Sequence, residues 1–392
     1  MSSPHFPPQP GPSLPPDEKT VHILGVGNIG LLFAHSLAQV LGPRFVTLLF
    51  HRENLVREWD QAGQEIHLAS DGVSILTKGY QFEVLQPSDL NPAPQTGSLD
   101  TNYIHNLIVA TKAAKTLQAF AAIRHRLSSC STVLFCQNGM GILDELKMEF
   151  PFVAHLWPGG FPQYLTAIVS HGVYSRQLFR IVHAGHGKVV IGHTQSLTAA
   201  KPTETPFLVE LLSHSSALAV AHVPAQELLQ TQLQKLVANS VINPLTVIFN
   251  CLNGHLFSNS QDLIVSRHGY VDFDAPSKLM HLLLSEACLV IQSLPEVQDL
   301  PGKEEIFSLS RMKEFVIDIA DKTSANTSSM LQDFRANRKS EVQYMNGYIV
   351  QRGLEFGINC GVNARVARIV EEKNKIQVGN ITTVFPELLS LE

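Results

Sequence analysis

The segment from Lys235 to Gly254 combines one lysine with several asparagines at helical spacing. On an ideal helix, Lys235, Asn239, Asn243 and Asn250 fall within about an 80° arc, and large aliphatic side chains occupy the opposite side. A solvated face is the alternative interpretation, but such a face usually carries Glu, Lys and Arg, whereas asparagine is a poor helix former. The pattern therefore favours a polar stripe built for hydrogen bonding.

This combination of side chains suits the reduction of a carbonyl group. Hydride transfer to a carbonyl carbon leaves a negative oxygen, and the Lys235 ammonium can stabilise that oxygen and protonate it. Amide side chains can donate hydrogen bonds to a carboxylate or a hydroxyl group and so fix the orientation of the substrate. The residue types therefore indicate a polar 2-oxo acid as the substrate.

A glycine-rich turn near the start of the chain could bind the hydride donor. The apolar run Val21–Leu24 leads into Gly25-x-Gly27-Asn28-x-Gly30, and apolar residues at helical spacing follow. In a strand–turn–helix context, the three glycines allow a tight turn, close approach of a pyrophosphate and close helix packing, while the helix N-terminus binds the anion. We predict dinucleotide binding here rather than a purely structural turn.

The residues after the next apolar run indicate which dinucleotide binds. The run Val46–Phe50 is followed by His51-Arg52-Glu53, with no acidic residue closing the strand. Strands in NAD sites usually end in Asp or Glu, whereas an arginine accommodates the 2′-phosphate of NADP. Arg52 therefore favours NADP(H), with an ordinary exposed arginine as the alternative.

Strands and helices alternate in the first half of the chain, which implies a parallel sheet with right-handed crossovers. Helices dominate after residue 224. Strands are expected at 21–24, 46–50, 107–110, 132–135, 167–173, 188–191 and 217–223, and helices at 31–41, 115–127, 226–250, 277–293, 305–321 and 338–356. We expect Pro244 to kink the helix at 226–250 near Ser240, because proline lacks an N–H group.

We therefore predict an α/β fold with an N-terminal Rossmann-type NADP-binding domain over 20–223 and a mainly helical substrate and catalytic domain over 224–375. Residues 1–19 include seven prolines and are expected to form a disordered tail. Residues 376–392 are expected to form a C-terminal tail.

Composition excludes several other classes of protein. The net charge of −5 offers no broad basic field for nucleic acid, and no apolar run reaches the roughly 18 residues that a membrane span needs. The 5 cysteines are scattered without zinc-type spacing, so no metal site is expected and we interpret them as reduced thiols. The start of the chain resembles neither a secretory signal nor an Arg-rich transit peptide, so we expect a cytosolic location, with a mitochondrial address left open.

A second polar segment could complete the site. Asn326-Thr327-Ser328-Ser329 supplies short hydrogen-bonding groups, and Asp333, Arg335, Arg338 and Glu341 follow within a helix-like pattern. These residues fit a catalytic role and, equally well, helix caps with surface ion pairs that involve Glu341. Sequence spacing leaves the two interpretations open.

Taken together, these segments resemble the ketopantoate reductase (2-dehydropantoate 2-reductase) family over residues 21 to 372. The resemblance rests on motifs in the family's order. They are GVGNIG; VATKAAK, with Lys112; CQNGMG, with Asn138; His171-Gly172; GHGKVVIG; KLVANSVINPLTVIFNCLNG; NTSSMLQDFRANRKSEVQYMNG; and FGINCGVN. The two long motifs are far more specific than a glycine turn.

The resemblance implies NADPH-dependent reduction of 2-dehydropantoate to pantoate, a precursor of pantothenate and coenzyme A, in a cleft between two domains. It implies that Lys235 is the general acid and that Glu341 assists substrate or lysine placement. A homodimer is one assembly in keeping with it. The substrate would contact Asn239, Asn243, Asn253, Asn326 and Ser329, and the cofactor would contact Gly25, Gly27, Asn28, Gly30, Arg52, Lys112 and Asn138.

The chain departs from the family pattern at a few places. Leu233 stands where the family often has an aromatic residue, and extra residues occur in the proline-rich start, at 92–102 and around 256–305. Two alternatives therefore stay open: a paralogous reductase of another 2-oxo acid, and a non-catalytic protein that binds NADPH as a sensor or scaffold. The retained Lys235 and Glu341 favour an enzyme.

Overall fold

The computed structural model describes residues 15–85, 103–151, 157, 160–194, 205–257, 274–373 and 380–390. The chain divides into two compact units. The first comprises Met1–Thr111, Gln118–Cys136 and Pro151–His222, and the second comprises Lys112–Leu117, Gln137–Phe150 and Val223–Glu392. The expected boundary near residue 224 lies close to the division at 222/223, but two short segments of the predicted first domain belong to the second unit.

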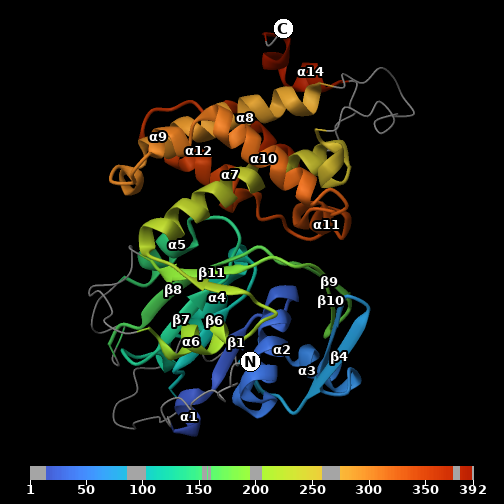
Figure 1. Cartoon of the computed structure of the whole chain (residues 1–392), viewed down its shortest axis with the longest axis vertical. Helices are drawn as coiled ribbons and strands as arrows, with labels where there is room; N and C mark the ends of the chain where they lie inside the picture. The colour runs from blue at the N-terminus through green and yellow to red at the C-terminus, as the bar shows by residue number, and fades with distance from the viewer. Residues whose placement is uncertain are drawn as a thin grey trace, which may run out of the picture. The chain divides into compact units, whose positions relative to one another are not determined.

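An eight-stranded sheet forms the centre of the first unit (Figure 1). Its order is β12-β11-β8-β7-β6-β1-β2-β5. Six of these strands, in the order β5-β2-β1-β6-β7-β8, follow the 3-2-1-4-5-6 order of dinucleotide-binding sheets. The sheet is mixed rather than wholly parallel, because β11 pairs antiparallel with β8. The strands are β1 Val21–Leu24, β2 Val46–Phe50, β5 Gln81–Val84, β6 Asn106–Val109, β7 Thr132–Phe135, β8 Gln163–Val169, β11 Val189–His193 and β12 Val220–His222.

A second sheet of four strands was not expected from the sequence. Its order is β4-β3-β10-β9, formed by β3 Glu65–Ser70, β4 Val73–Lys78, β9 Gly172–Gln177 and β10 Arg180–Gly185. Asp71 and Gly72, both with positive φ, join β3 to β4, and such an Asp-Gly pair is the sequence signal of a tight hairpin. The stretch expected to be β-rich over 167–173 does contain strand residues, but they form the end of β8 and the start of β9, with a break after Val169.

Helix α2 (Asn28–Leu41) lies between these two sheets (Figure 1). It contacts β1 and β2 on one side and β3, β9 and β10 on the other. Its side chains Leu31, Leu32 and Phe33 are therefore buried although they cover more than one face. The other helices of this unit are α1 Pro16–Lys19, α3 Glu53–Gln61, α6 Phe207–Ser213, η1 Pro43–Phe45 and η3 Arg124–Arg126, while α4 Ala113–Ala121 crosses the division between the units.

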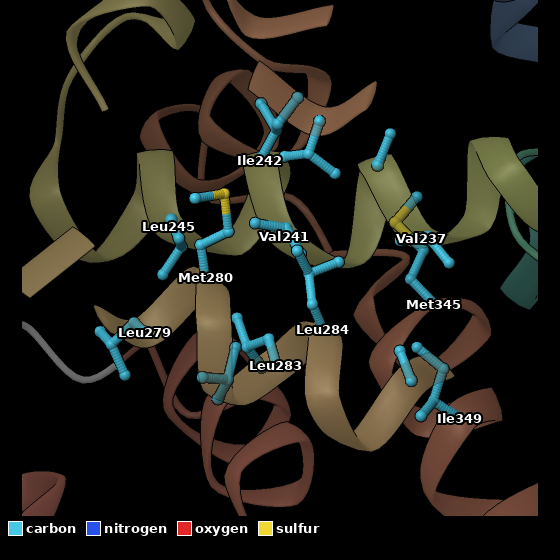
Figure 2. Packing of buried hydrophobic residues seen from close by; sticks show 14 of the residues in the cluster. Val237, Val241, Ile242, Leu245, Leu279, Met280, Leu283, Leu284, Met345 and Ile349 are labelled. Atoms are coloured by element: carbon cyan, nitrogen blue, oxygen red, sulfur yellow. The ribbon is translucent and has the colours of Figure 1, made fainter. Parts of the chain in front are cut away.

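The second unit is helical and packs around α7 (Ala225–Phe249). Figure 2 shows aliphatic residues of α7 such as Val241 and Leu245 against Met280 and Leu284 of α8 (Ala275–Ser293), with Met345 and Ile349 nearby. The remaining helices of this unit are α5 Ile142–Glu149, η5 Asn253–His255, η6 Pro295–Val297, α9 Lys303–Ile306, α10 Leu309–Lys322, α11 Ser329–Arg335, η7 Val342–Tyr344, α12 Asn346–Glu355, α13 Gly361–Glu371, α14 Ile381–Val384 and η9 Pro386–Ser390.

Helix α7 is continuous through Pro244. Proline cannot donate to the carbonyl four residues earlier, which is that of Ser240. The buried Asn346 side chain replaces this donor, since its Nδ2 lies 2.8 Å from Ser240 O and 2.9 Å from Asn363 Oδ1. Asn363 Nδ2 in turn donates to Glu286 Oε2 at 2.8 Å, and both Glu286 oxygens accept backbone N–H groups at the start of α13. A buried polar chain therefore joins α7, α12, α13 and α8.

Several predicted boundaries are wrong for identifiable reasons. The helix expected at 305–321 is interrupted before Ser308, which caps α10. The helix expected at 338–356 begins only at Asn346, because residues 338–341 are non-helical and η7 follows. Residues 16–19 form α1, and residues 381–390 fold onto the core through the buried Phe385 and Leu388, so neither expected tail has the predicted bounds. Residues 1–14, the loop at 92–102 and residues 258–273 lie outside the described residues.

Candidate active site

The glycine turn of the first unit has the geometry of an anion site. Gly25 has φ +106°, and a Cβ on it would lie 2.6 Å from Thr111 N. A Cβ on Gly30 would lie 1.9 Å from Gly25 O, whereas one on Gly27 would meet no described atom within 4 Å apart from its chain neighbours. The first and third glycines are therefore required by packing, and the second leaves the backbone approachable.

These residues fit a dinucleotide. Helix α2 starts at Asn28 with no acidic residue in its first turn, so its N-terminal N–H groups and dipole favour an anion. The Asn28 side chain is occupied in the fold, since its Nδ2 donates to Val173 O at 3.1 Å and its Oδ1 accepts from the Ser175 hydroxyl. Only the backbone of Asn28 is therefore expected to contact a phosphate.

Arg52 lies two residues after the end of β2 and is the N-cap residue of α3. Its side chain is 55% exposed, and its Nη2 lies 4.0 Å from Glu58 Oε2. An exposed guanidinium after the second strand is where the 2′-phosphate of NADP would be bound.

In the second unit, α7 presents Lys235 to the turn that carries Asn138. Lys235 Nζ donates to Asn138 Oδ1 at 2.8 Å, and both side chains are half-buried. The acceptor is a neutral amide, and an ammonium group has three donors in all. The structure therefore brings together a candidate proton donor and a candidate cofactor residue that lie 97 positions apart in the sequence.

Lys112 and Glu341 meet in the same unit. Lys112 Nζ lies 2.7 Å from Asp333 Oδ2 and 3.5 Å from Glu341 Oε2. Glu341 Oε1 accepts the Ala113 N–H at 3.0 Å, and Asp333 Oδ1 accepts Arg338 Nε at 2.8 Å. Burial would lower the pKa of Lys112, but the charges of Glu341 and Asp333 outweigh burial, so this pKa is raised above its ordinary value. Lys112 therefore stays protonated and acts as a fixed positive charge.

Glu341 is buried and non-helical, so its interpretation as a surface ion-pair residue is wrong. The helix-cap interpretation of the preceding segment is confirmed at Ser328, whose side chain accepts the Leu331 N–H at the start of α11. Ser328 Oγ also lies 2.6 Å from Thr246 Oγ1 of α7. The cap interpretation therefore holds for Ser328, and a catalytic role of Glu341 stays a prediction.

The candidate substrate residues fall into two groups along α7. Asn239 and Asn243 lie one and two turns beyond Lys235, and the buried Asn243 directs Nδ2 toward Met345 Sδ at 3.7 Å. Asn253 follows the end of α7, and fifteen residues from Lys235 to Asn250 already span about 22 Å of helix. The structure therefore does not bring Asn253 close to Lys235.

The group that lies beyond the end of α7 consists of Asn253, Asn326 and Ser329, and Asn253 already has hydrogen-bond partners there. Asn253 Nδ2 donates to Thr323 Oγ1 at 2.9 Å, and its N–H donates to Asn326 O at 3.1 Å. Ser329 is exposed beside the capping residue Ser328. Substrate contact by Asn253, Asn326 and Ser329 stays a prediction.

Tyr344, which sequence reasoning missed, supports the turn that carries Asn138 and the helix α5 that follows it. Met140 N donates to Tyr344 O at 2.8 Å, and Tyr344 Oη donates to Glu145 Oε2 at 3.1 Å. A Cβ on Gly139 would lie 2.2 Å from Tyr344 O. Asp333 belongs to the polar segment that the sequence offered for the site, but its contact with Lys112 was not predicted. Neither this contact nor those of Tyr344 could be found locally, because each partner segment is about 200 residues distant in the sequence.

No metal centre is formed by His, Cys, Asp and Glu among the residues described. Over the same residues, no helix combines the length and apolar character that crossing a bilayer would require.

The fold and the site together define a class of protein. A 3-2-1-4-5-6 sheet with a glycine turn between its first strand and the following helix is the architecture of a dinucleotide-binding protein. The family model described as ketopantoate reductase PanE/ApbA matches residues 21–196, and that described as ketopantoate reductase PanE/ApbA C terminal matches residues 227–374. This chain is an oxidoreductase of the ketopantoate reductase family.

Similar proteins cover nearly the whole chain. A ketoisovalerate reductase of Beauveria bassiana is 27% identical over 90% of this chain and 83% of its own length. A probable 2-dehydropantoate 2-reductase of Schizosaccharomyces pombe is 28% identical over 90% of this chain and 96% of its own. A crystal structure of a probable 2-dehydropantoate 2-reductase from Bacillus subtilis matches with a TM-score of 0.63 at 20% identity, covering 90% of this chain and 99% of that one. The fold expected from the sequence is thereby confirmed.

Proposed function

We propose that this protein reduces 2-dehydropantoate to pantoate with NADPH, the product being a precursor of pantothenate and coenzyme A. The observation that carries the proposal is the half-buried Lys235 ammonium held 2.8 Å from Asn138 Oδ1. A positive charge that is fixed in a site of this family can stabilise and protonate a developing alkoxide.

The residues of the chain have distinct roles in this proposal. The bound reduced nicotinamide supplies a hydride to the C2 carbonyl carbon of the substrate. Lys235 gives a proton to the C2 oxygen and is reprotonated from solvent. Asn239 and Asn243 orient the carboxylate and the hydroxyl group by hydrogen bonding, with Asn253, Asn326 and Ser329 as further predicted contacts.

The remaining polar residues position the cofactor. Glu341 accepts a hydrogen bond from the Ala113 N–H, and Glu341 and Asp333 together keep Lys112 protonated. We therefore infer that Glu341 acts by fixing the position of residues 112–113. The glycine turn binds the pyrophosphate, Arg52 binds the 2′-phosphate, and Lys112 and Asn138 contact the remainder of the cofactor. A cytosolic location and a homodimeric assembly complete the proposal as expectations from the sequence.

A second candidate function is the reduction of 2-oxoisovalerate, which the relatives named ketoisovalerate reductases favour. The two acids differ in one hydroxymethyl group. A site that hydrogen bonds this hydroxyl can reject the analogue without it by a factor on the order of 10⁴, whereas an apolar pocket discriminates far less.

The test measures NADPH oxidation at 340 nm by the purified protein with both acids and with a panel of other 2-oxo acids, using NADH as the cofactor control. Selective turnover of 2-dehydropantoate with NADPH supports the proposal. Preference for 2-oxoisovalerate or another acid keeps the chemistry and replaces the substrate. Binding of NADPH without turnover of any acid overturns the enzymatic function in favour of a sensor or scaffold.

A further inference from the structure

Arg52, the proposed contact for the 2′-phosphate, already has an acidic neighbour. Arg52 Nη2 lies 4.0 Å from Oε2 of Glu58, six residues further along on α3. The two side chains are 55% and 31% exposed, so solvent only partly screens their attraction.

The carboxylate of Glu58 is unusual in its surroundings. Its Oε2 atom is shielded from solvent and accepts no hydrogen bond from any residue that the structure describes. A shielded carboxylate oxygen without donors is costly unless a cation compensates for it, and Arg52 is the cation recorded within 4.0 Å of it. The next residue, Trp59, is fully buried against Phe50 and Phe179, which fixes this turn of α3 and keeps Glu58 beside Arg52.

We propose that Glu58 is a specificity-determining residue that sets how strongly the protein prefers NADPH to NADH. The inference rests on the proposed binding of the 2′-phosphate by Arg52. Without a phosphate, Glu58 pairs with the guanidinium. A 2′-phosphate must compete with Glu58 for the same guanidinium and is repelled by it, whereas the neutral 2′-hydroxyl of NADH meets neither penalty. Glu58 therefore weakens NADPH selectively.

The test uses Glu58→Gln, which removes the charge and keeps the size of the side chain. The matched control is Asp60→Asn, which makes the same change of charge on the exposed side of the same helix, where Asp60 Oδ1 accepts from Gln64 Nε2 at 2.8 Å. Calorimetry gives the Kd of the full-length protein for NADPH and NADH. The short probes adenosine 2′,5′-bisphosphate and 5′-AMP isolate the 2′-phosphate from the nicotinamide end.

We expect Glu58→Gln to bind NADPH and the bisphosphate about two- to fivefold more tightly, the range of a partly exposed ion pair. NADH and 5′-AMP should bind as to wild type, and Asp60→Asn should change none of the four constants. In an Arg52→Ala background, Glu58→Gln should produce no gain, because the competition acts through the guanidinium. Raising the salt concentration should shrink the gain.

Two results overturn the role of Glu58 alone: a wild-type preference for NADPH that Glu58→Gln leaves unchanged, or a loss of NADH affinity in the variant. The second result would show that Glu58 accepts the ribose 2′-hydroxyl. Equal binding of NADPH and NADH by the wild-type protein would instead overturn the NADPH assignment itself.

Discussion

The two units of this protein build their candidate sites in opposite ways. In the first unit, the glycine turn brings residues 25–30 together within one strand–turn–helix segment, and its chemistry belongs to the backbone. In the second unit, Lys112, Asn138, Lys235 and Glu341 come from segments up to 229 positions apart, and the chemistry belongs to side chains. A local site can be found from a motif, whereas a dispersed site depends on the packing of the helices that carry it.

We expect a change at Lys235 in the second unit to affect turnover, and changes at the glycine turn and Arg52 in the first unit to affect cofactor binding. Lys235→Ala should lower kcat by a factor on the order of 10²–10⁴, because the general acid is lost, while the Kd for NADPH stays near that of wild type. Steady-state kinetics and calorimetry measure the two quantities. The exposed Lys339→Ala serves as the control, and full turnover by Lys235→Ala would remove this lysine from the mechanism.

Arg52→Ala in the first unit should have the opposite effect to Lys235→Ala: cofactor affinity should change and kcat should not. Loss of a charge-assisted contact to phosphate should weaken NADPH binding about 10- to 100-fold, leave NADH nearly unchanged and leave kcat at saturating NADPH close to that of wild type. Fluorescence titration with both cofactors measures the effect. An equal loss for NADPH and NADH would contradict a 2′-phosphate contact.

The glycines separate packing from binding within the first unit. Gly30→Ala should destabilise the protein by about 1–3 kcal/mol or more, because its Cβ would lie 1.9 Å from Gly25 O. Gly27→Ala should leave the thermal midpoint unchanged and weaken dinucleotide binding, since its Cβ meets no described atom beyond its neighbours within 4 Å. Thermal unfolding measures the stability of both variants, and calorimetry measures their affinity for the dinucleotide. If Gly27→Ala lowered the thermal midpoint and left dinucleotide binding intact, Gly27 would be required for packing and not for binding.

In the second unit, the chain of hydrogen bonds from Ser240 O through Asn346 and Asn363 to Glu286 should stabilise the fold and take no part in catalysis. Asn346→Leu should cost about 1–3 kcal/mol, because Ser240 O and Asn363 Oδ1 lose their donor. Adding Pro244→Ala restores a backbone N–H four residues after Ser240 and should recover part of the loss. Urea unfolding of both single variants and the double variant measures the coupling. Strict additivity would mean that Asn346 does not substitute for the missing N–H.

The smallest expected effect is a loss of folding stability at acid pH that arises from Glu83 in the first unit. His22, whose Nε2 lies 3.7 Å from Glu83 Oε1, and Arg126, which donates a hydrogen bond to Glu83 Oε2, lower the pKa of Glu83 to about 2, against burial, which raises it. A carboxyl with a lowered folded-state pKa stabilises the fold above its ordinary pKa of 4.5, and this contribution is lost as the pH falls from 4.5 toward 2. Glu83→Gln should therefore lower stability near pH 7 and match wild type near pH 2. A pH-independent difference in the thermal midpoint would argue against this ion pair.

The sequence predicted the regular elements where a periodic pattern was strong. The strands Val21–Leu24, Val46–Phe50 and Thr132–Phe135 match, and α7 lies within one residue of its expected bounds. The second sheet was missed, because β4 has mostly exposed side chains and lacks the alternation of a half-buried strand. Its Asp71-Gly72 turn was the signal available.

Residue identities and spacing alone indicated the family and predicted the glycine turn and the lysine–asparagine stripe, because these depend on local backbone geometry and on long contiguous motifs. Only the tertiary structure showed that Lys235 meets Asn138, that Glu341 is buried beside Lys112, and that Asp333 and Tyr344 support them. It also showed that Asn253 lies beyond the far end of α7 from Lys235. Contacts between distant segments follow from how helices pack, and no local pattern encodes which of several polar side chains will face one another.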